Sequence, residues 1–184
     1  MVLISEQEGI NKNFSEVLSM RIYKIAQVAQ IAQSKYYHGS YDLLPNGTIL
    51  TPDKGTFMGT FSQDEMDSHF KLEQFRPSNY LSRNNAVYMC DNPDDIDNAG
   101  GANEHIYLVS PQGKVEKHDV NWFSEIDFIM SEAWDNGTQE EQETIDKVKN
   151  AALNYWNGVP HYNESVWEYL VPSAKVRQEV YEDE

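Results

Sequence analysis

The chain has 184 residues, of which 40% are hydrophobic. This is enough apolar material for one core, so a chain disordered throughout is excluded. The formal net charge is −16, and residues 91–184 carry 21 of the 30 acidic side chains but only 6 of the 14 basic ones. This balance argues against duplex DNA, RNA or an anionic membrane as a general partner, because binding phosphates needs a basic face.

The start of the chain and its single cysteine indicate the compartment. Apolar residues stop after Ile4 and acidic ones follow, which is typical of neither a signal peptide nor a membrane span. Cys90, the one cysteine, lies in an apolar run, so we interpret it as a small buried hydrophobe rather than a reactive thiol. We expect a cytoplasmic protein with no membrane partner.

An amphipathic helix is predicted over residues 15–33. Apolar side chains recur there every three or four positions, at Leu18, Ile22, Ile25, Ala29 and Ala32. The helix belongs to a leading segment, residues 1–34, which precedes the main domain, residues 35–184. The apolar stripe of this helix could pack on the core or dock on a partner protein. Packing on the core is favoured, and both alternatives stay open.

The main domain is predicted to combine short strands, turns and a few helices. Helices are expected over residues 63–73 and 139–157, the second opened by a capping box of Thr138 and Glu141. Strands are expected over residues 35–38, 48–50, 86–90, 105–110, 115–117, 166–171 and 175–180. Strands and helices do not alternate regularly, which favours an α+β fold over a parallel βαβ sheet.

The first strand leads into the motif Tyr37-His38-Gly39-Ser40. A glycine after His38 lets the backbone approach a planar ligand and offer its N–H and C=O to a carboxamide. The histidine side chain can hydrogen-bond a ribose hydroxyl. Taken alone, these four residues favour a plainer interpretation, a histidine whose hydrogen bonds are satisfied at the end of a strand.

Five segments resemble the bacterial rifamycin ADP-ribosyltransferases in order and spacing. They are residues 37–40 (YHGS), 43–52 (LLPNGTILTP), 78–80 (SNY), 87–89 (VYM) and 106–113 (IYLVSPQG), in a stretch of nearly half the chain. Residues 167–171 (WEYLV) are similar to the last-strand motif of the diphtheria-toxin-like and poly-ADP-ribose polymerase families, which share this fold and use a His, a Tyr and a Glu. The resemblance implies an ADP-ribosyltransferase-like split β-sheet domain with flanking helices and NAD as a substrate.

The resemblance also implies roles for single residues around NAD. His38 would contact the adenosine ribose, and Gly39, with Ser40 beside it in the motif, would clamp the nicotinamide amide. Tyr88 would stack on the nicotinamide ring, with Tyr80 as the other aromatic candidate.

Two acids compete for the catalytic role. The rifamycin pattern implies Asp119, and the toxin-like pattern implies Glu168. Breaking the bond between ribose and nicotinamide passes through an oxocarbenium-like state, which a carboxylate on a rigid strand stabilises best. Glu168 lies in a predicted strand and Asp119 in a predicted loop, so Glu168 is favoured, with an outward-facing acid on an alternating strand as an equal alternative.

The sequence therefore predicts a NAD-dependent mono-ADP-ribosyltransferase that releases nicotinamide and transfers ADP-ribose to an unknown acceptor. The acidic second half favours a protein or small molecule over nucleic acid as that acceptor. Because basic residues are concentrated in the first half, Arg76 or Arg83 is expected near the pyrophosphate.

The rival interpretation is a non-catalytic structural or interaction protein that keeps the transferase fold as a scaffold. Acidic chains with this motif order resemble phage-encoded proteins, which implies the host cytoplasm or a virion as the location. No metal is expected, because the remaining histidines lack metal-ligand spacing and are predicted to be surface or capping groups. They are His69, His105, His118 and His161.

Overall fold

The computed structural model describes residues 35–52, 63–162 and 164–180. All of these residues except Lys35 belong to one compact unit, which starts at Tyr36. The predicted leading helix, residues 15–33, and the whole leading segment 1–34 lie outside the described residues.

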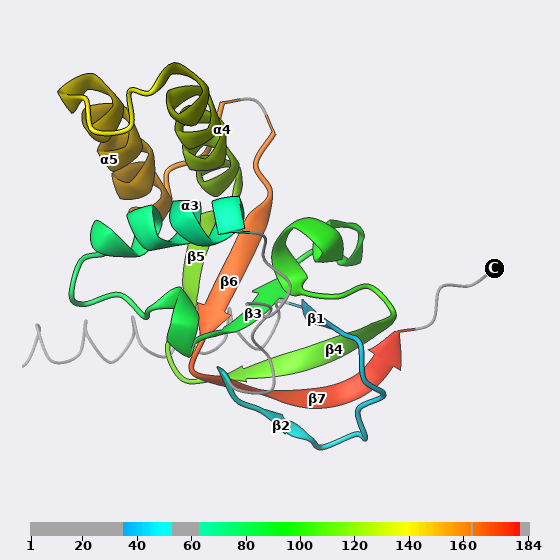
Figure 1. Ribbon diagram of the computed structural model, residues 1–184. Helices are drawn as coiled ribbons and strands as arrows, with labels where there is room; N and C mark the ends of the chain where they lie inside the picture. Colours follow the sequence, from blue (N-terminus) through cyan, green and yellow to red (C-terminus); the bar gives the residue numbers. More distant parts are fainter. Residues whose placement is uncertain (1–34, 53–62, 163, 181–184) are drawn as a thin grey trace, which may run out of the picture. The chain divides into compact units, whose positions relative to one another are not determined.

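The centre of this unit is an antiparallel sheet. Its seven strands in the described part of the chain follow the order β2-β7-β4-β1-β3-β6-β5 (Figure 1). The strands are β1 (Tyr36–Ser40), β2 (Ile49–Leu50), β3 (Val87–Cys90), β4 (His105–Gln112), β5 (Glu116–Asp119), β6 (Trp167–Val171) and β7 (Ser173–Val180). Together with the helices, this sheet confirms the predicted α+β class.

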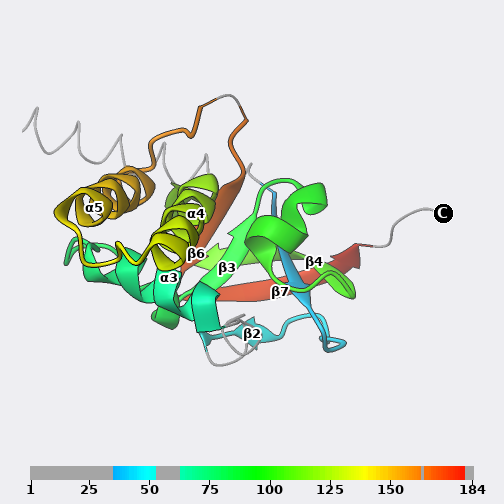
Figure 2. The ribbon, with the colours of Figure 1, turned by 45° about the horizontal axis from the view of Figure 1, so that its top comes forward.

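Three helices gather beside β3, β5 and β6, as Figures 1 and 2 show. They are α3 (Gln63–Gln74), α4 (Asn121–Asn136) and α5 (Gln142–Trp156). Their apolar stripes meet Tyr88 of β3 and Leu170 of β6 in one buried cluster. Burial of apolar area against the sheet, rather than helix propensity, holds such helices in place. The helical members of this cluster include Leu72, Trp122, Ile126, Met130, Val148, Ala152 and Trp156.

The opposite side of the same strands faces a second core. Side chains alternate along β3, so Val87 and Met89 join that second cluster while Tyr88 faces the helices. Tyr36 of β1 and Tyr107 of β4 lie in the second cluster as well. Strand β3 is therefore buried on both faces, which explains its continuous apolar sequence.

Three local predictions were wrong. Helix α4 occupies a stretch for which no helix was predicted, and it ends at Gly137, which has a left-handed φ of 67°. Helix α5 begins at Gln142 with Glu141 as its N-cap and no side-chain capping bond, so the predicted capping box at Thr138 does not form. Strand β1 continues through Gly39 to Ser40 instead of ending in a turn at the glycine.

Candidate functional site

Three of the residues singled out from the sequence lie on neighbouring central strands. His38 is on β1, Tyr88 on β3 and Glu168 on β6, and these strands are adjacent in the order β1-β3-β6. The register pairs Tyr37 with Cys90 and Cys90 with Glu168. The folded chain therefore brings residues far apart in sequence to one part of the sheet.

Glu168 opens onto a pocket of about 180 Å³, here named the Glu168 pocket. Its walls come from β3, β6, the start of α4 and the π-helical turn η4 (Ile96–Gly100). Pockets that enclose a whole drug-sized ligand are usually about 300–1,000 Å³, so this one suits a single ring or sugar of a larger ligand. It is lined by Arg83, Tyr88, Asp97, Asn98, Ala99, Gly101, Val120, Phe123, Ser124 and Glu168.

The two oxygens of Glu168 differ in their surroundings. The side chain is 1% exposed, and its Oε1 accepts hydrogen bonds from Nη1 of Arg83, at 2.7 Å, and from the hydroxyl of Tyr155. Its Oε2 is buried and has no hydrogen-bond partner within the described residues. Burial raises the pKa of this carboxyl above its ordinary value, and the charge of Arg83 opposes that rise. One oxygen is thus held by the protein, and the other has no hydrogen-bond partner among the described residues.

Arg83 is a buried cation surrounded by aromatic rings. Its guanidinium carbon lies 4.8 Å from the ring centre of Phe123 and 5.2 Å from that of Tyr88. The ring of Tyr155 is 5.5 Å away, and its hydroxyl accepts a 3.2 Å hydrogen bond from Nη1. Arg83 therefore lines the pocket as the partner of Glu168. Tyr155 and Phe123 were not singled out from the sequence.

Arg76, the other arginine expected near a pyrophosphate, lies elsewhere. Its Nε donates to Glu73 at 2.9 Å, and its Nη1 donates to the carbonyl oxygen of Tyr80 at 2.6 Å. Neither Arg76 nor Tyr80 lines the Glu168 pocket.

Tyr88 forms one wall of the pocket, whereas Tyr80 packs against the helical core. The Tyr88 hydroxyl donates to the carbonyl oxygen of Arg83 at 3.0 Å. Burial raises the pKa of Tyr88 to about 12, so the phenol stays neutral near pH 7. Of the two aromatic candidates, the structure brings Tyr88 to Glu168.

His38 does not line the pocket. The register pairs Tyr37 with Cys90 and Cys90 with Glu168, so Tyr37 and not His38 shares the face of Glu168. His38 pairs with Tyr107 across β1 and β4, and alternation puts its side chain on the opposite side of β1 from Tyr37. Its Nδ1 lies 2.9 Å from the carbonyl oxygen of Tyr88. A carbonyl can only accept, so Nδ1 carries the proton. Burial lowers the pKa of His38, which favours the neutral ring.

The backbone of Gly39 is approached closely, but by the chain itself. Gly39 forms an isolated bridge with Gly101, and a Cβ at position 39 would overlap the carbonyl oxygen of Ala102. The surface expected to clamp a nicotinamide amide is covered by these two residues. Ser40, next in the motif, accepts a 3.0 Å hydrogen bond from the backbone N–H of Asp42 through its hydroxyl oxygen.

Asp119 ends strand β5 and is fully buried, so its assignment to a loop was wrong. Its Oδ1 accepts from the backbone N–H of Asn121 at 3.1 Å, and its Oδ2 accepts from that of His161 at 2.7 Å. It does not line the Glu168 pocket. Both oxygens accept hydrogen bonds from the backbone, which favours a structural role for Asp119.

Two of the remaining histidines depart from the prediction that they are surface or capping groups. His69 and His118 are fully buried. Nδ1 of His118 lies 2.9 Å from the carbonyl oxygen of Tyr155, and burial lowers the pKa of this histidine to about 4.

Among the described residues, no group of three His, Cys, Asp or Glu side chains could hold a metal ion. Cys90 is buried, and burial raises its thiol pKa to about 12.

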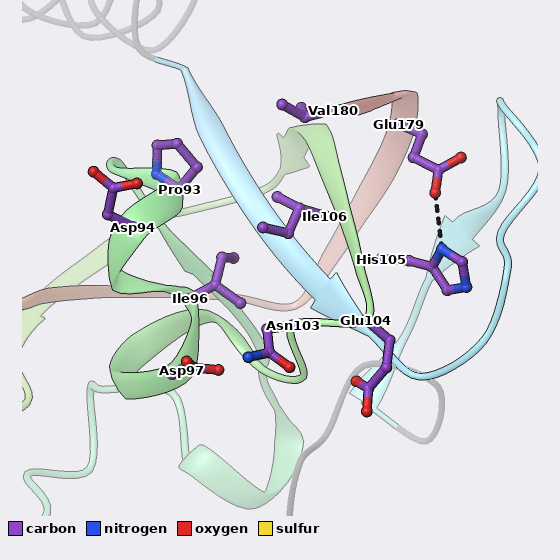
Figure 3. Close-up of a pocket in the computed structure, with 10 residues that line it drawn as sticks. All are labelled: Pro93, Asp94, Ile96, Asp97, Asn103, Glu104, His105, Ile106, Glu179 and Val180. Carbon is purple, nitrogen blue, oxygen red and sulfur yellow. Dashed lines mark hydrogen bonds and ion pairs between the residues drawn. The ribbon is translucent and has the colours of Figure 1, made fainter. Parts of the chain in front are cut away.

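A second hollow, of about 490 Å³, lies on the other side of η4 and shares Asp97 with the Glu168 pocket. Figure 3 shows that its side chains come from the segment 93–106 and the end of β7. Nδ1 of His105 lies 2.8 Å from Oε1 of Glu179 at its edge. The exposed acids Asp94 and Glu104 also line it. None of the described residues that line it is Lys or Arg, so this hollow does not suit a pyrophosphate.

Comparisons with models of protein families, with curated proteins and with solved structures find no match to this chain. Within the described ranges, no helix has both the length and the apolar character that crossing a membrane requires.

Proposed function

We propose that this protein is a NAD-dependent mono-ADP-ribosyltransferase with an ADP-ribosyltransferase-like fold. The observation that carries the proposal is the unpartnered Oε2 of Glu168, buried in a pocket that Tyr88 also lines. A buried carboxylate oxygen without a partner costs stability, and a catalytic role is one reason why a protein keeps such a group. The resemblance of the motif around His38 and of the segment around Glu168 supports the same function.

The chemistry proposed for Glu168 follows from its unpartnered oxygen, Oε2. Heterolysis of the bond between ribose and nicotinamide leaves positive charge on the ribose ring, and nicotinamide departs as a neutral molecule. A carboxylate that accepts a hydrogen bond from a ribose hydroxyl stabilises that charge, and the interaction strengthens as the bond breaks. The pocket volume of about 180 Å³ suits the nicotinamide or ribose end of NAD. Tyr88 offers a ring on which nicotinamide would stack.

The charge around the site bears on the chemical class of the molecule that accepts ADP-ribose. Asp97 lines both the Glu168 pocket and the acidic second hollow. Negative charge at this edge favours a protein or small molecule over nucleic acid as acceptor. The cytoplasm, either of a cell or of a phage host, is the proposed location.

Nicotinamide release from NAD tests the function, with Glu168→Gln as the decisive variant. Removing one strong electrostatic contact of a transition state lowers turnover by about 10²- to 10³-fold, so release should fall by this factor. Glu132→Gln, on the exposed outer side of α4, is the matched control and should keep wild-type activity. Circular dichroism must show folded protein, because the change leaves Arg83 without its buried counter-charge. Wild-type protein that releases no nicotinamide would refute the proposal.

A second candidate is favoured by the contact at Gly39. Because Gly101 and Ala102 cover this backbone, the described arrangement leaves no space for a planar amide against it. A non-catalytic interaction protein, such as a virion component, would keep this arrangement permanently. It predicts neither NAD binding nor nicotinamide release by the wild type, which separates it from the transferase.

A further inference from the structure

We propose that Arg83, assisted by Tyr155, is the positioning residue of the site: it holds Glu168 through Oε1 alone and thereby directs the charged, unpartnered Oε2 toward the ribose. This inference rests on the proposed function. It differs from the pyrophosphate contact expected of Arg83, because the arginine would act through Glu168 and not on NAD.

The backbone of Arg83 is fixed from two sides. Its N–H donates to Oε1 of Glu73 at 2.7 Å, and its carbonyl oxygen accepts from the Tyr88 hydroxyl at 3.0 Å. The residue opens the short helix η2 (Arg83–Asn85), where the hydroxyl oxygen of Ser82 accepts a hydrogen bond from the backbone of Asn84. The two hydrogen bonds of the Arg83 backbone fix the point from which its side chain starts.

The guanidinium is fixed as well. Rings of Tyr88, Phe123 and Tyr155 surround it at 4.8 to 5.5 Å, and the side chain is 4% exposed. One nitrogen, Nη1, donates both to Tyr155 and to Oε1 of Glu168. A two-nitrogen fork would occupy both carboxylate oxygens. This single-nitrogen contact uses one oxygen and leaves Oε2 without a described partner.

Arg83 is also the main source of positive charge at Glu168. His118 on β5 is the cross-strand partner of Glu168. Burial lowers the pKa of His118 to about 4, so this histidine is neutral near pH 7. The other titratable groups that face Glu168 are neutral or acidic. They are Tyr88 and Cys90 on β3, Tyr155 on α5, Asp119 on β5 and Asp97 on η4. Without Arg83, burial and the neighbouring acids would favour protonated Glu168.

The predicted effect of removing Arg83 is therefore a change in pH dependence. In an Arg83→Gln variant, Glu168 stays protonated at neutral pH, so nicotinamide release at pH 7 should fall by about 100-fold or more. It should then rise roughly tenfold per pH unit until the new pKa is reached. The KM for NAD should change little, because in this proposal Arg83 acts through Glu168 and not on NAD. Arg83→Lys should restore part of the activity at pH 7.

A second measurement follows the ionisation of Glu168 directly and does not depend on activity. Infrared difference spectra, taken against a Glu168→Gln reference, report whether the Glu168 carboxyl is ionised. We expect it ionised at pH 7 in wild-type protein and protonated in Arg83→Gln. Tyr155→Phe, which removes only a hydroxyl, should shift the Glu168 titration upward by a smaller amount. It is the deciding variant if Arg83→Gln does not fold.

The outcomes separate the two proposals. If wild-type protein neither binds NAD nor releases nicotinamide, the proposed function fails, and the positioning inference fails with it whatever the spectra show. If wild-type protein is active but Arg83→Gln keeps the wild-type Glu168 titration and pH profile, the positioning inference alone is overturned. An unshifted titration in Tyr155→Phe overturns it equally when Arg83→Gln is unfolded. A large rise in KM with unchanged kcat would instead assign Arg83 to NAD binding.

Discussion

Asp119 should stabilise the fold, and replacing it should affect unfolding rather than chemistry. Its carboxylate accepts backbone hydrogen bonds from Asn121 at 3.1 Å and from His161 at 2.7 Å. Hydrogen bonds to a charged group contribute about 1.5–3 kcal/mol each. Asp119→Asn keeps one acceptor oxygen and turns an amide NH₂ toward the other N–H, so the free energy of unfolding should fall by about 2–3 kcal/mol. Asp119→Ala loses both bonds and should lose about 3–6 kcal/mol.

Urea denaturation followed by tryptophan fluorescence measures this effect. Trp122 reports on the region directly, because its ring centre lies 4.5 Å from that of His161. Asp135→Asn, an exposed Asp on α4, is the control and should change stability by less than about 0.5 kcal/mol. Stability of Asp119→Ala within about 1 kcal/mol of wild type would refute the structural role. A stable Asp119→Asn variant that has lost nicotinamide release would return Asp119 to the catalytic role.

Two further predictions concern burial. Gly39→Ala forces a Cβ into the carbonyl oxygen of Ala102, so the free energy of unfolding, measured by thermal unfolding, should fall by about 3 kcal/mol. Gly137→Ala, which is strained only by its left-handed φ, is the control and should lose about 1 kcal/mol. Equal losses in the two variants would contradict the close contact at Gly39. Burial lowers the pKa of His118 from 6.5 in the unfolded chain to about 4 in the folded protein, so the unfolded state binds more protons between these pH values. The free energy of unfolding should therefore fall as the pH drops from about 6.5 to 4, by up to about 3 kcal/mol. Urea titrations at pH 7 and pH 5 should therefore show a smaller pH dependence in His118→Asn than in wild type, and an unchanged dependence would refute the buried neutral ring.

Much of the fold could be predicted because the local signals are strong. The strands β3, β4 and β6 each contain an apolar run, and each was predicted to within two residues at either end. Helix α4 was missed although its buried face follows the spacing of an amphipathic helix. That stripe, Trp122, Ile126, Met130 and Ala133, is the signal that could have found it.

The site was less predictable, because its contacts join residues distant in sequence. Glu168 could be chosen from its position in a strand, but its partners Arg83 and Tyr155 come from a short helix and from α5. No local pattern shows that one Glu168 oxygen is held and the other unpartnered. The cover over Gly39 likewise depends on how the segment before β4 folds back, which periodicity does not encode.

The central claim is that the Glu168 pocket receives the nicotinamide end of NAD. Saturation-transfer difference NMR with NAD tests it directly, because transfer to the nicotinamide protons requires that ring to contact the protein. Ser124→Trp places a large side chain at an exposed position that lines the pocket, and Ser131→Trp, exposed farther along α4, is the control. We expect strong transfer to the nicotinamide protons in wild type and in Ser131→Trp, and its loss in Ser124→Trp. No transfer in wild type, or equal transfer in all three proteins, would contradict the claim.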